Sequence, residues 1–327
     1  MEQSTIVSAI NQGLRRAMDS DSHVLLMGED IGKLGGVFRA TEGLQKDFGE
    51  DRVIDSPLAE SGIVGTAIGL ALYGYRPVIE IQFDGFVYPA FDQIVVQLAR
   101  MRYRSAGALH LPITIRLPIG GGIGSVEHHG ESPEAYFAAT PGLRVVACSD
   151  PTDAYWMIQQ AIASDDPVIF LEPKRRYWQK GDLDTSADLS KALPMNKAKV
   201  VVEGSQCTLI SYGPTVATCL QAASLAAEDG VSLEVIDLRS LSPLDMPTLE
   251  ASVKKTGRVV VVHEASSSGG VGGEIGHCLM QSCFYYLQAP VLRVTGYDTP
   301  YPPSRIEDDY LPDADRVLDA VAKTMSY

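Results

Sequence analysis

The feature that most constrains the fold of this chain is the alternation of short apolar runs with segments of helical length. Apolar residues recur at helical spacing between residues 5 and 20, and the apolar run 23–27 that follows ends at a glycine. The same alternation continues along the chain. It predicts further strands at 77–83, 113–117, 145–148, 168–171, 207–211, 233–238, 259–263 and 291–295, and helices at 62–73, 88–103, 151–163, 216–228, 246–255, beyond 273 and at 313–323. Strands that alternate with helices favour parallel sheets covered on both faces, so the sequence predicts an α/β fold with a doubly wound sheet.

One break in this alternation divides the chain into two parts. Between residues 181 and 198 the periodicity fades into Asp, Ser, Lys and Pro, which is a composition typical of linkers. A length of 327 residues suits two domains of ordinary size. We therefore predict an N-terminal domain over 1–180, a linker over 181–198 and a C-terminal domain over 199–327.

The charge balance restricts the classes of partner. The formal net charge is −14, with 41 acidic residues against 27 basic ones, and the basic cluster 174–176 is too short to reverse it. Nucleic acids and anionic membranes attract clustered Lys and Arg, so we expect neither as the main partner. The first residues do not form a signal peptide, and no apolar run reaches the ~18 residues of a membrane span. We expect a cytoplasmic protein, although an organelle matrix protein without its transit peptide would have the same pattern.

Common cofactor and nucleophile motifs do not occur. The five cysteines include no C-x-x-C pair, so neither a disulfide framework nor a zinc site is indicated. The glycine loops Gly120–Gly124 and Gly269–Gly273 do not fit the dinucleotide-binding pattern, and the P-loop, G-x-S-x-G and H-E-x-x-H patterns do not occur. These results disfavour NAD-dependent, P-loop, α/β-hydrolase and zinc-peptidase activities.

Three segments place polar and aromatic residues at predicted strand ends. Glu60 lies at the start of a helix that is rich in small residues, where a carboxylate alone would be explained by the helix dipole. Phe86 follows the strand 77–83, and His129 follows the strand 113–117 and its glycine turn. Because ligands bind at the carboxyl ends of strands in open α/β sheets, we expect these side chains to share one edge.

These segments resemble the β subunits of thiamine-diphosphate-dependent 2-oxo acid dehydrogenases, the decarboxylating E1 components, and are most similar to the branched-chain type. The resemblance covers nearly the whole chain, and its motifs occur in the family's order. They are Ser-Pro-Leu-Ala-Glu60, Glu80-Ile-Gln-Phe-x-x-Phe86-x-x-Pro-Ala-Phe-Asp-Gln93, His129-x-x-Ser-Pro-Glu-Ala-Tyr-Phe137 and, in the C-terminal part, Ala289-Pro-Val-Leu-Arg-Val-Thr-Gly-Tyr-Asp298. The resemblance implies a pyrimidine-binding N-terminal domain and a transketolase-like C-terminal domain.

The resemblance also implies the residues that bind the cofactor. Glu60 matches the glutamate that hydrogen-bonds to N1′ of the aminopyrimidine and shifts the ring to its imino tautomer, which generates the C2 carbanion. Sharing that proton requires a carboxyl group in a dry site. Phe86 matches the aromatic residue that stacks on the pyrimidine. The implied cofactor-binding set is Glu29, Leu58, Ala59, Glu60, Gln82, Phe86, Val87, Tyr88 and Pro89.

His129 matches the family histidine near the reactive carbon, which steers the substrate carboxylate or protonates during acyl transfer to lipoamide. Its spacing to Ser132-Pro133 selects His129 over His128, which we expect to be structural. Phe83, Phe86 and His129 are therefore the expected substrate contacts. Glu60 and His129 are the expected catalytic residues.

Two metal ions follow from the same resemblance. The family's Mg²⁺–diphosphate motif, Gly-Asp-Gly followed by Asn, is absent here and lies on the α subunit in the family, so we expect an α subunit to hold Mg²⁺. The family also binds a structural K⁺ through backbone oxygens. The matching residues are Ile113, Ala161, Ile162, Ser164 and Asp166, and Ser164 stands where relatives often carry Asp.

The expected function is that of an E1 β subunit in an α₂β₂ heterotetramer. With its α subunit it would decarboxylate a 2-oxo acid, either branched-chain or pyruvate, and pass the acyl group to the lipoyl group of the E2 acyltransferase. Two alternatives stay open: a subunit of a two-chain transketolase or acetoin-cleaving enzyme, and a non-catalytic scaffold. We expect the C-terminal domain to serve assembly rather than chemistry, with only a local hydrogen bond for His263 and Glu264.

Overall fold

The N-terminal half forms a seven-stranded sheet in the computed structural model, which describes residues 2–327. Its order is β12-β6-β7-β5-β4-β2-β3, and six of the strands are parallel. Their bounds are β2 Val24–Gly28, β3 Val53–Asp55, β4 Arg76–Glu80, β5 Thr114–Ile119, β6 Arg144–Ala147 and β7 Val168–Pro173. All parallel strands therefore end at one edge, which the following loops line.

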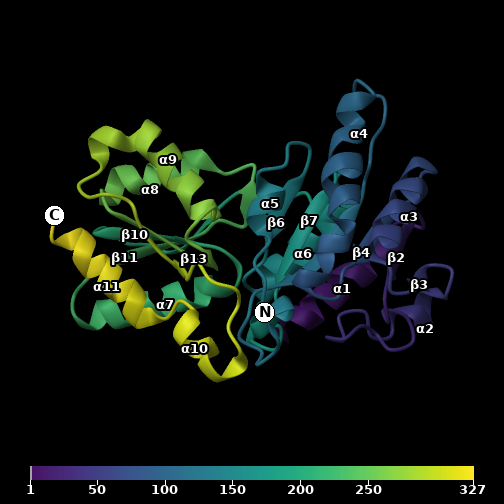
Figure 1. Cartoon of the computed structure of the whole chain (residues 1–327), viewed down its shortest axis with the longest axis horizontal. Helices are drawn as coiled ribbons and strands as arrows, with labels where there is room; N and C mark the ends of the chain where they lie inside the picture. The colour runs from purple at the N-terminus through teal and green to yellow at the C-terminus, as the bar shows by residue number, and fades with distance from the viewer. Residues whose placement is uncertain (1) are drawn as a thin grey trace.

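Helices cover both faces of this sheet, as predicted for a doubly wound fold (Figure 1). On one face α1 (Ile6–Ser20) packs against α6 (Pro151–Ala163) over one apolar cluster, which α2 (Leu44–Phe48) extends. The other face carries α3 (Glu60–Leu72), α5 (Glu134–Ala138) and a long helical stretch over 84–104. The sheet is thus buried on both sides, which explains why its strands are continuous apolar runs.

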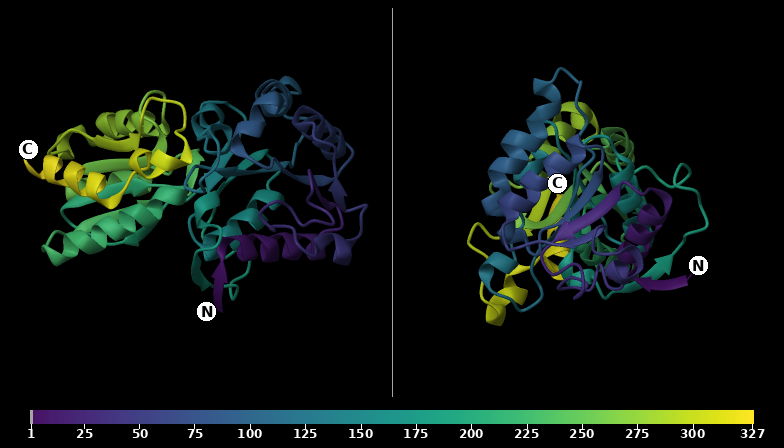
Figure 2. Two further views of the ribbon diagram at one scale, coloured as in Figure 1. Left: turned by 60° about the horizontal axis from the view of Figure 1, so that its bottom comes forward. Right: turned by 90° about the vertical axis from the view of Figure 1, so that its right-hand side faces the viewer.

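The C-terminal half forms a five-stranded sheet with the order β14-β13-β10-β11-β9. The strands are β9 Lys199–Val202, β10 Cys207–Ser211, β11 Leu233–Asp237, β13 Val259–Ser266 and β14 Leu292–Gly296, and only β9 is antiparallel. Helices α8 (Met246–Thr256) and α9 (Val271–Cys283) lie on one face, and α7 (Val216–Glu228) and α11 (Ala314–Met325) on the other (Figure 1). The two halves form two lobes side by side (Figure 2).

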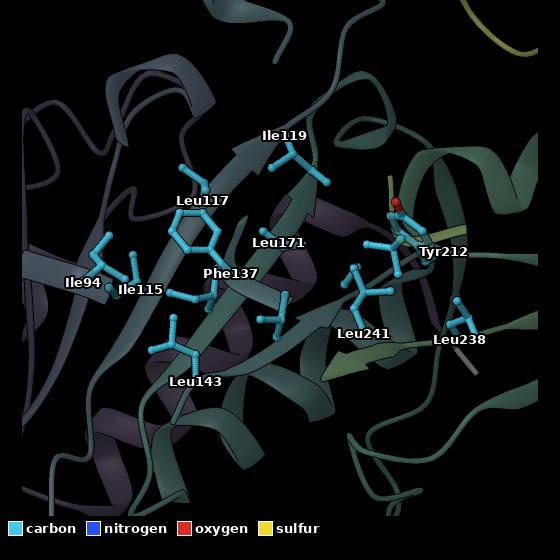
Figure 3. Packing of buried hydrophobic residues seen from close by; sticks show 14 of the residues in the cluster. Ile94, Ile115, Leu117, Ile119, Phe137, Leu143, Leu171, Tyr212, Leu238 and Leu241 are labelled. Atoms are coloured by element: carbon cyan, nitrogen blue, oxygen red, sulfur yellow. The ribbon is translucent and has the colours of Figure 1, made fainter. Parts of the chain in front are cut away.

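The two lobes share one core. A single apolar cluster runs from Leu117 and Leu171 in the first sheet to Tyr212 and Leu241 in the second half (Figure 3). In addition, β12 (Ser240–Ser242) leaves the C-terminal half and pairs antiparallel with β6 of the first sheet. The halves are therefore fixed to each other by packing as well as by the chain connection.

The structure contains short elements that were not predicted, namely β3, β9, β12, α2 and α5, and it differs from the prediction at two further places. The first residues of the predicted linker form β8 (Lys180–Leu183), which pairs antiparallel with β1 (Glu2–Thr5). The predicted helix 88–103 is not uniform: it consists of a 3₁₀ stretch (Asp84–Ala90), a π-helical stretch (Gln93–Leu98) and α4 (Ala99–Arg104). Pro89 lies in the first of these and has no backbone N–H to donate, which disfavours a regular α-helix there.

Among residues 2–327, no helix is both long and apolar enough to cross a membrane.

Candidate active site

Glu60 is the buried carboxylate of the N-terminal domain that has no partner within the described residues. It is 8% exposed and is the first residue of α3, but its side chain accepts no hydrogen bond from residues 2–327. The other buried carboxylates of this domain are paired: Glu80 and Glu172 with Arg116, Asp84 with Lys174, Glu134 with Tyr212, and Asp153 with Arg239. The Glu60 oxygens are not among the fully buried atoms of the described residues, so an unpartnered acceptor remains accessible there. Glu60 is therefore available to a ligand.

Glu29 lies near Glu60, and Gln82 contacts Glu29. Gln82 donates from Nε2 to the backbone oxygen of Glu29 at 3.5 Å, which joins the ends of β2 and β4. Burial raises the pKa of the Glu29 carboxyl, and the neighbouring charges of Asp30 and Glu60 raise it further. The two glutamates are thus close enough to interact, and the residues that follow β2, β3 and β4 supply polar groups at one sheet edge.

Phe83, Phe86 and His129 form an aromatic cluster at the same edge. The His129 ring centroid lies 4.1 Å from that of Phe83 and 5.2 Å from that of Phe86. Burial lowers the pKa of His129 below its ordinary value, and the charges of His128 and Lys174 act in the same direction. Its buried Nδ1 has no hydrogen-bond partner among the described residues. The neutral imidazole can therefore accept a proton or donate to a ligand.

The remaining predicted pocket residues are spread around this cluster. Val87 is fully buried in the apolar core, so its side chain does not face the pocket. Leu58, Ala59 and Pro89 are exposed, and the half-exposed Tyr88 donates to Glu131 at 3.2 Å. The structure thus brings Glu29, Glu60, Gln82, Phe83, Phe86 and His129 to one edge, while Leu58, Ala59, Tyr88 and Pro89 form its rim.

Sequence reasoning missed a buried ion pair behind His129. Lys174, directly after β7, donates from Nζ to Asp84 Oδ2 at 2.6 Å and to the backbone oxygen of His129 at 2.5 Å. Asp84 also accepts the backbone N–H of Gly120 at 3.1 Å. Both charged side chains are inaccessible to solvent. Their positions at strand ends were the available signal, because a charged residue there faces the ligand edge.

The C-terminal domain contacts the segments that carry His129 and Lys174. Glu264, at the end of β13, accepts a hydrogen bond from the backbone N–H of Gly121 and pairs with Arg175 at 3.2 Å. The role expected for Glu264, a local hydrogen bond, was therefore wrong. Its place at the carboxyl edge of the second sheet, which faces the first, explains the contact, and this facing could not be read from local sequence.

Glu134 of the His129-x-x-Ser-Pro-Glu motif is a second contact between the halves. It starts α5, is fully buried, and accepts a hydrogen bond from the Tyr212 hydroxyl at 2.6 Å. Burial raises the pKa of its carboxyl to about 7, although the Tyr212 hydroxyl acts against this. This motif therefore combines the site histidine with a residue that docks the second domain.

The five residues expected at a potassium site lie together at the opposite edge, around the end of α6. Arg76 donates to the backbone oxygens of Ile162 and Ser164 at 3.1 and 3.3 Å. The backbone oxygens of Ala161, Ile113 and Asp166 accept from Ser164 N, Val168 N and Ser164 Oγ, respectively. A carbonyl oxygen has two lone pairs, so each of these oxygens keeps one free for a cation.

Comparison with known proteins identifies the class. Residues 2–179 match the transketolase pyrimidine-binding domain, and residues 196–317 match the transketolase C-terminal domain. A solved structure described as a split-gene transketolase, an inactive β₄ tetramer, superposes with a TM-score of 0.80 and 22% identity over 98% of both chains. The fold is thus of the two-domain transketolase type.

Two relatives narrow this class to a family. The chain is 58% identical to the pyruvate dehydrogenase E1 component subunit β of Leifsonia xyli subsp. xyli, over 98% of this chain and 95% of the relative. It is 52% identical to the 3-methyl-2-oxobutanoate dehydrogenase subunit β of Mycobacterium tuberculosis, over 98% and 92%. The chain belongs to the family of E1 β subunits of 2-oxo acid dehydrogenases, which confirms the family expected from its motifs. Membership implies thiamine diphosphate as cofactor and an α subunit as partner.

Proposed function

We propose that this chain is the β subunit of an α₂β₂ E1 component that decarboxylates a branched-chain 2-oxo acid or pyruvate and passes the acyl group to the lipoyl group of an E2 acyltransferase. The observation that carries the proposal is the unpaired carboxylate of Glu60 at the same sheet edge as the unpartnered imidazole of His129. Relatives named for both substrates support the reaction class and leave the choice between the two acids to experiment.

The residues at this edge fit the pyrimidine half of thiamine diphosphate. Bound thiamine diphosphate supplies the nucleophilic carbon for attack on the substrate carbonyl. Glu60, whose carboxylate has no partner among the described residues, holds a proton at the pyrimidine N1′. Phe86, half-buried beside His129, offers a ring face for stacking on the pyrimidine.

His129 acts on the substrate side of the same pocket. Its neutral imidazole, held against Phe83, can donate a hydrogen bond to the 2-oxo acid carboxylate or carry a proton during acyl transfer. Lys174, whose charge is paired with Asp84, lies behind it and binds the backbone oxygen of His129. The imidazole itself is therefore the group that would hydrogen-bond to the substrate carboxylate.

An α subunit completes the site. The chain lacks the Gly-Asp-Gly motif, so the diphosphate and Mg²⁺ need residues from the partner. Large apolar side chains stand exposed on the loops and short helices that follow the strands of this edge, and exposed apolar side chains that form a patch mark protein contacts. They are Leu58, Tyr88, Ile123, Val126 and Tyr136.

We also propose a structural K⁺ at the end of α6. The last carbonyl groups of a helix lack helical donors and carry the negative end of its dipole, which favours a cation. Arg76 already supplies part of that charge to Ile162 and Ser164. The ion would add to this contact through Ile113, Ala161 and Asp166, so its contribution to stability is small.

Reconstitution tests the proposed function. The purified chain alone should show no 2-oxo acid decarboxylation and no micromolar binding of thiamine diphosphate with Mg²⁺ by calorimetry. Mixed with its α subunit, it should decarboxylate pyruvate or 2-oxoisovalerate. Micromolar cofactor binding by the single chain would contradict the half-site, and activity only on ketose phosphates would assign the pair to the transketolases.

A further inference from the structure

The loop that carries His129 is held from the C-terminal domain through its backbone. The loop leaves β5 at Gly120 and contains the η3 turn, Glu127–His129. The backbone N–H groups of Gly122 and Gly124 donate to the Glu307 carboxylate at 3.0 Å each, and that of Gly121 donates to Glu264. Hydrogen bonds from successive N–H groups to charged carboxylates are strong, so these contacts with another domain constrain the path of the loop.

Tyr301 fills the space inside this loop. A Cβ atom at Gly121 would lie 1.7 Å from the Tyr301 hydroxyl oxygen, and one at Gly130 would lie 2.5 Å from its ring. The same hydroxyl accepts from Gly122 N at 2.9 Å and donates to Glu307 at 2.7 Å. The ring, 7% exposed, therefore occupies room that only glycine leaves on both sides of the loop, next to His129.

The N-terminal domain holds the other side of the same loop. Lys174 binds the His129 backbone oxygen and the Asp84 carboxylate, and Asp84 binds Gly120 N. Burying such charges is costly unless their geometry is fixed. The loop that carries His129 is thus held on one side by residues of its own domain and on the other by residues of the C-terminal domain.

We propose that Tyr301, Glu264 and Glu307 of the C-terminal domain are positioning residues that set the orientation of His129 in the active site. This deepens the proposed function and rests on it. Displacement of a catalytic group by about 1 Å can cost on the order of 100-fold in rate. Docking of the second domain is therefore a requirement for the reaction at the first.

A double-mutant comparison in the assembled α₂β₂ enzyme tests this. Tyr301→Ala is made in the wild-type chain and in His129→Ala, and kcat and KM are measured through lipoamide. We expect a loss of ~10- to 100-fold in kcat/KM in the wild-type background and less than ~2-fold in the His129→Ala background, because residues that act through one group are not additive. Tyr301→Phe, which keeps the ring, should restore most of the activity.

Tyr310→Phe is the matched control. The Tyr310 ring packs against Tyr301 at 5.2 Å between centroids, but its hydroxyl donates to Tyr297 O and not to the loop. This variant should keep full activity. If Tyr301→Ala does not assemble, Glu307→Gln replaces it in the same comparison, since it weakens the bonds to Gly122 and Gly124 and keeps the side-chain shape.

Hydrogen exchange separates this inference from the proposed function. Backbone amides of residues 120–130 should exchange faster in Tyr301→Ala than in Tyr310→Phe, whatever reaction the complex catalyses. Equal fold losses in both backgrounds, full activity in an assembled Tyr301→Ala enzyme, or unchanged exchange would overturn the inference. A wild-type complex that is inactive on every 2-oxo acid would instead contradict the proposed function. The exchange rates would still show whether Tyr301 holds the loop that carries His129.

Discussion

Both sheets carry a histidine near the carboxyl end of a strand, but the two side chains lie in different surroundings. His263 on β13 is fully buried, its Nδ1 lies 3.1 Å from the Ala265 oxygen, and burial lowers its pKa to about 4. A Cβ atom at Gly270 or Gly272 would lie within 2.7 Å of its ring. The glycine loop of the second sheet thus closes over its own histidine.

In the first sheet the glycine loop leaves its histidine accessible. His129 is partly exposed beside Phe83 and Phe86, and Tyr301 of the other domain fills the loop in its place. Two similar sheets therefore serve two purposes. The edge of the first sheet is open to ligands, whereas the edge of the second is closed and its domain supplies side chains that hold the loop of the first. The contrast explains why fold alone does not assign function to a sheet edge.

The largest effect is expected from substitution of Glu60. It distinguishes a carboxylate that acts on the cofactor from one that only caps a helix. Glu60→Gln should fold normally and lose ~10²–10⁴-fold in turnover, because an amide cannot exchange the N1′ proton. The comparison is Asp313, whose side chain caps α11 by accepting from Arg316 N at 2.8 Å. Asp313→Ala should cost about 1 kcal/mol in stability and leave turnover unchanged. A Glu60→Gln enzyme that kept more than about a third of its activity would reduce Glu60 to a helix-start residue.

His129→Ala should have the next largest effect. We expect a loss on the order of 100-fold in the overall reaction through lipoamide and a smaller loss in the partial reaction with an artificial electron acceptor, which omits acyl transfer. If His129 mainly orients the substrate carboxylate, both assays should fall together with a raised KM. His128→Ala, a change at its exposed neighbour, is the control. Unchanged rates in both assays would exclude His129 from the site.

The sequence predicted the elements best where local signals were strong. Helix α6 was predicted with the bounds it has, because Asp150 caps it and Pro151 occupies its first position. The strand pair β1–β8 and the transfer of β12 into the first sheet were not predicted. Their partners are distant in sequence, and no local pattern encodes such pairing.

The candidate site divides in the same way. The motifs around Glu60 and His129 indicated side chains at one edge, and the structure places them there. The contacts of Lys174, Glu264 and Tyr301 could not be predicted, because each depends on how a second strand end or a second domain faces the loop. Residues that touch a ligand belong to sequence motifs that can be recognised. The residues that hold them in position act through contacts between distant parts of the chain, which no local motif shows.

The contact between the two halves predicts a pH dependence of stability at Glu134. Because burial raises its pKa from 4.5 to about 7, the folded protein binds this proton more tightly than the unfolded chain. Its stabilising contribution is therefore full below pH 4.5 and is lost as the pH rises to about 7. Gln stays neutral, so above pH ~7 the free energy of unfolding of Glu134→Gln should exceed that of wild type by on the order of 1–3 kcal/mol. The variant should therefore unfold at a higher temperature.

Thermal unfolding at a series of pH values measures this. Near pH ~4, below the ordinary pKa of 4.5 for a Glu carboxyl, the two proteins should unfold at similar temperatures. Glu127→Gln, at an exposed position, controls for the loss of one surface charge. A stability gap that does not change between these pH values would mean that Glu134 is ionised in the folded protein at both.

The smallest expected effect is at the edge opposite the active site, where the proposed K⁺ contributes to stability and not to chemistry. Potassium at about ten times its dissociation constant would stabilise the fold by about 1.4 kcal/mol, which corresponds to about 2 °C in melting temperature for a chain of this size. Melting in KCl should therefore exceed melting in NaCl or choline chloride at equal ionic strength. Arg76 lies against the backbone oxygens of Ile162 and Ser164, so Arg76→Gln removes a neighbouring like charge and should widen the difference between KCl and NaCl. Identical melting in all three salts, for wild type and Arg76→Gln alike, would show that no potassium ion binds at this helix end.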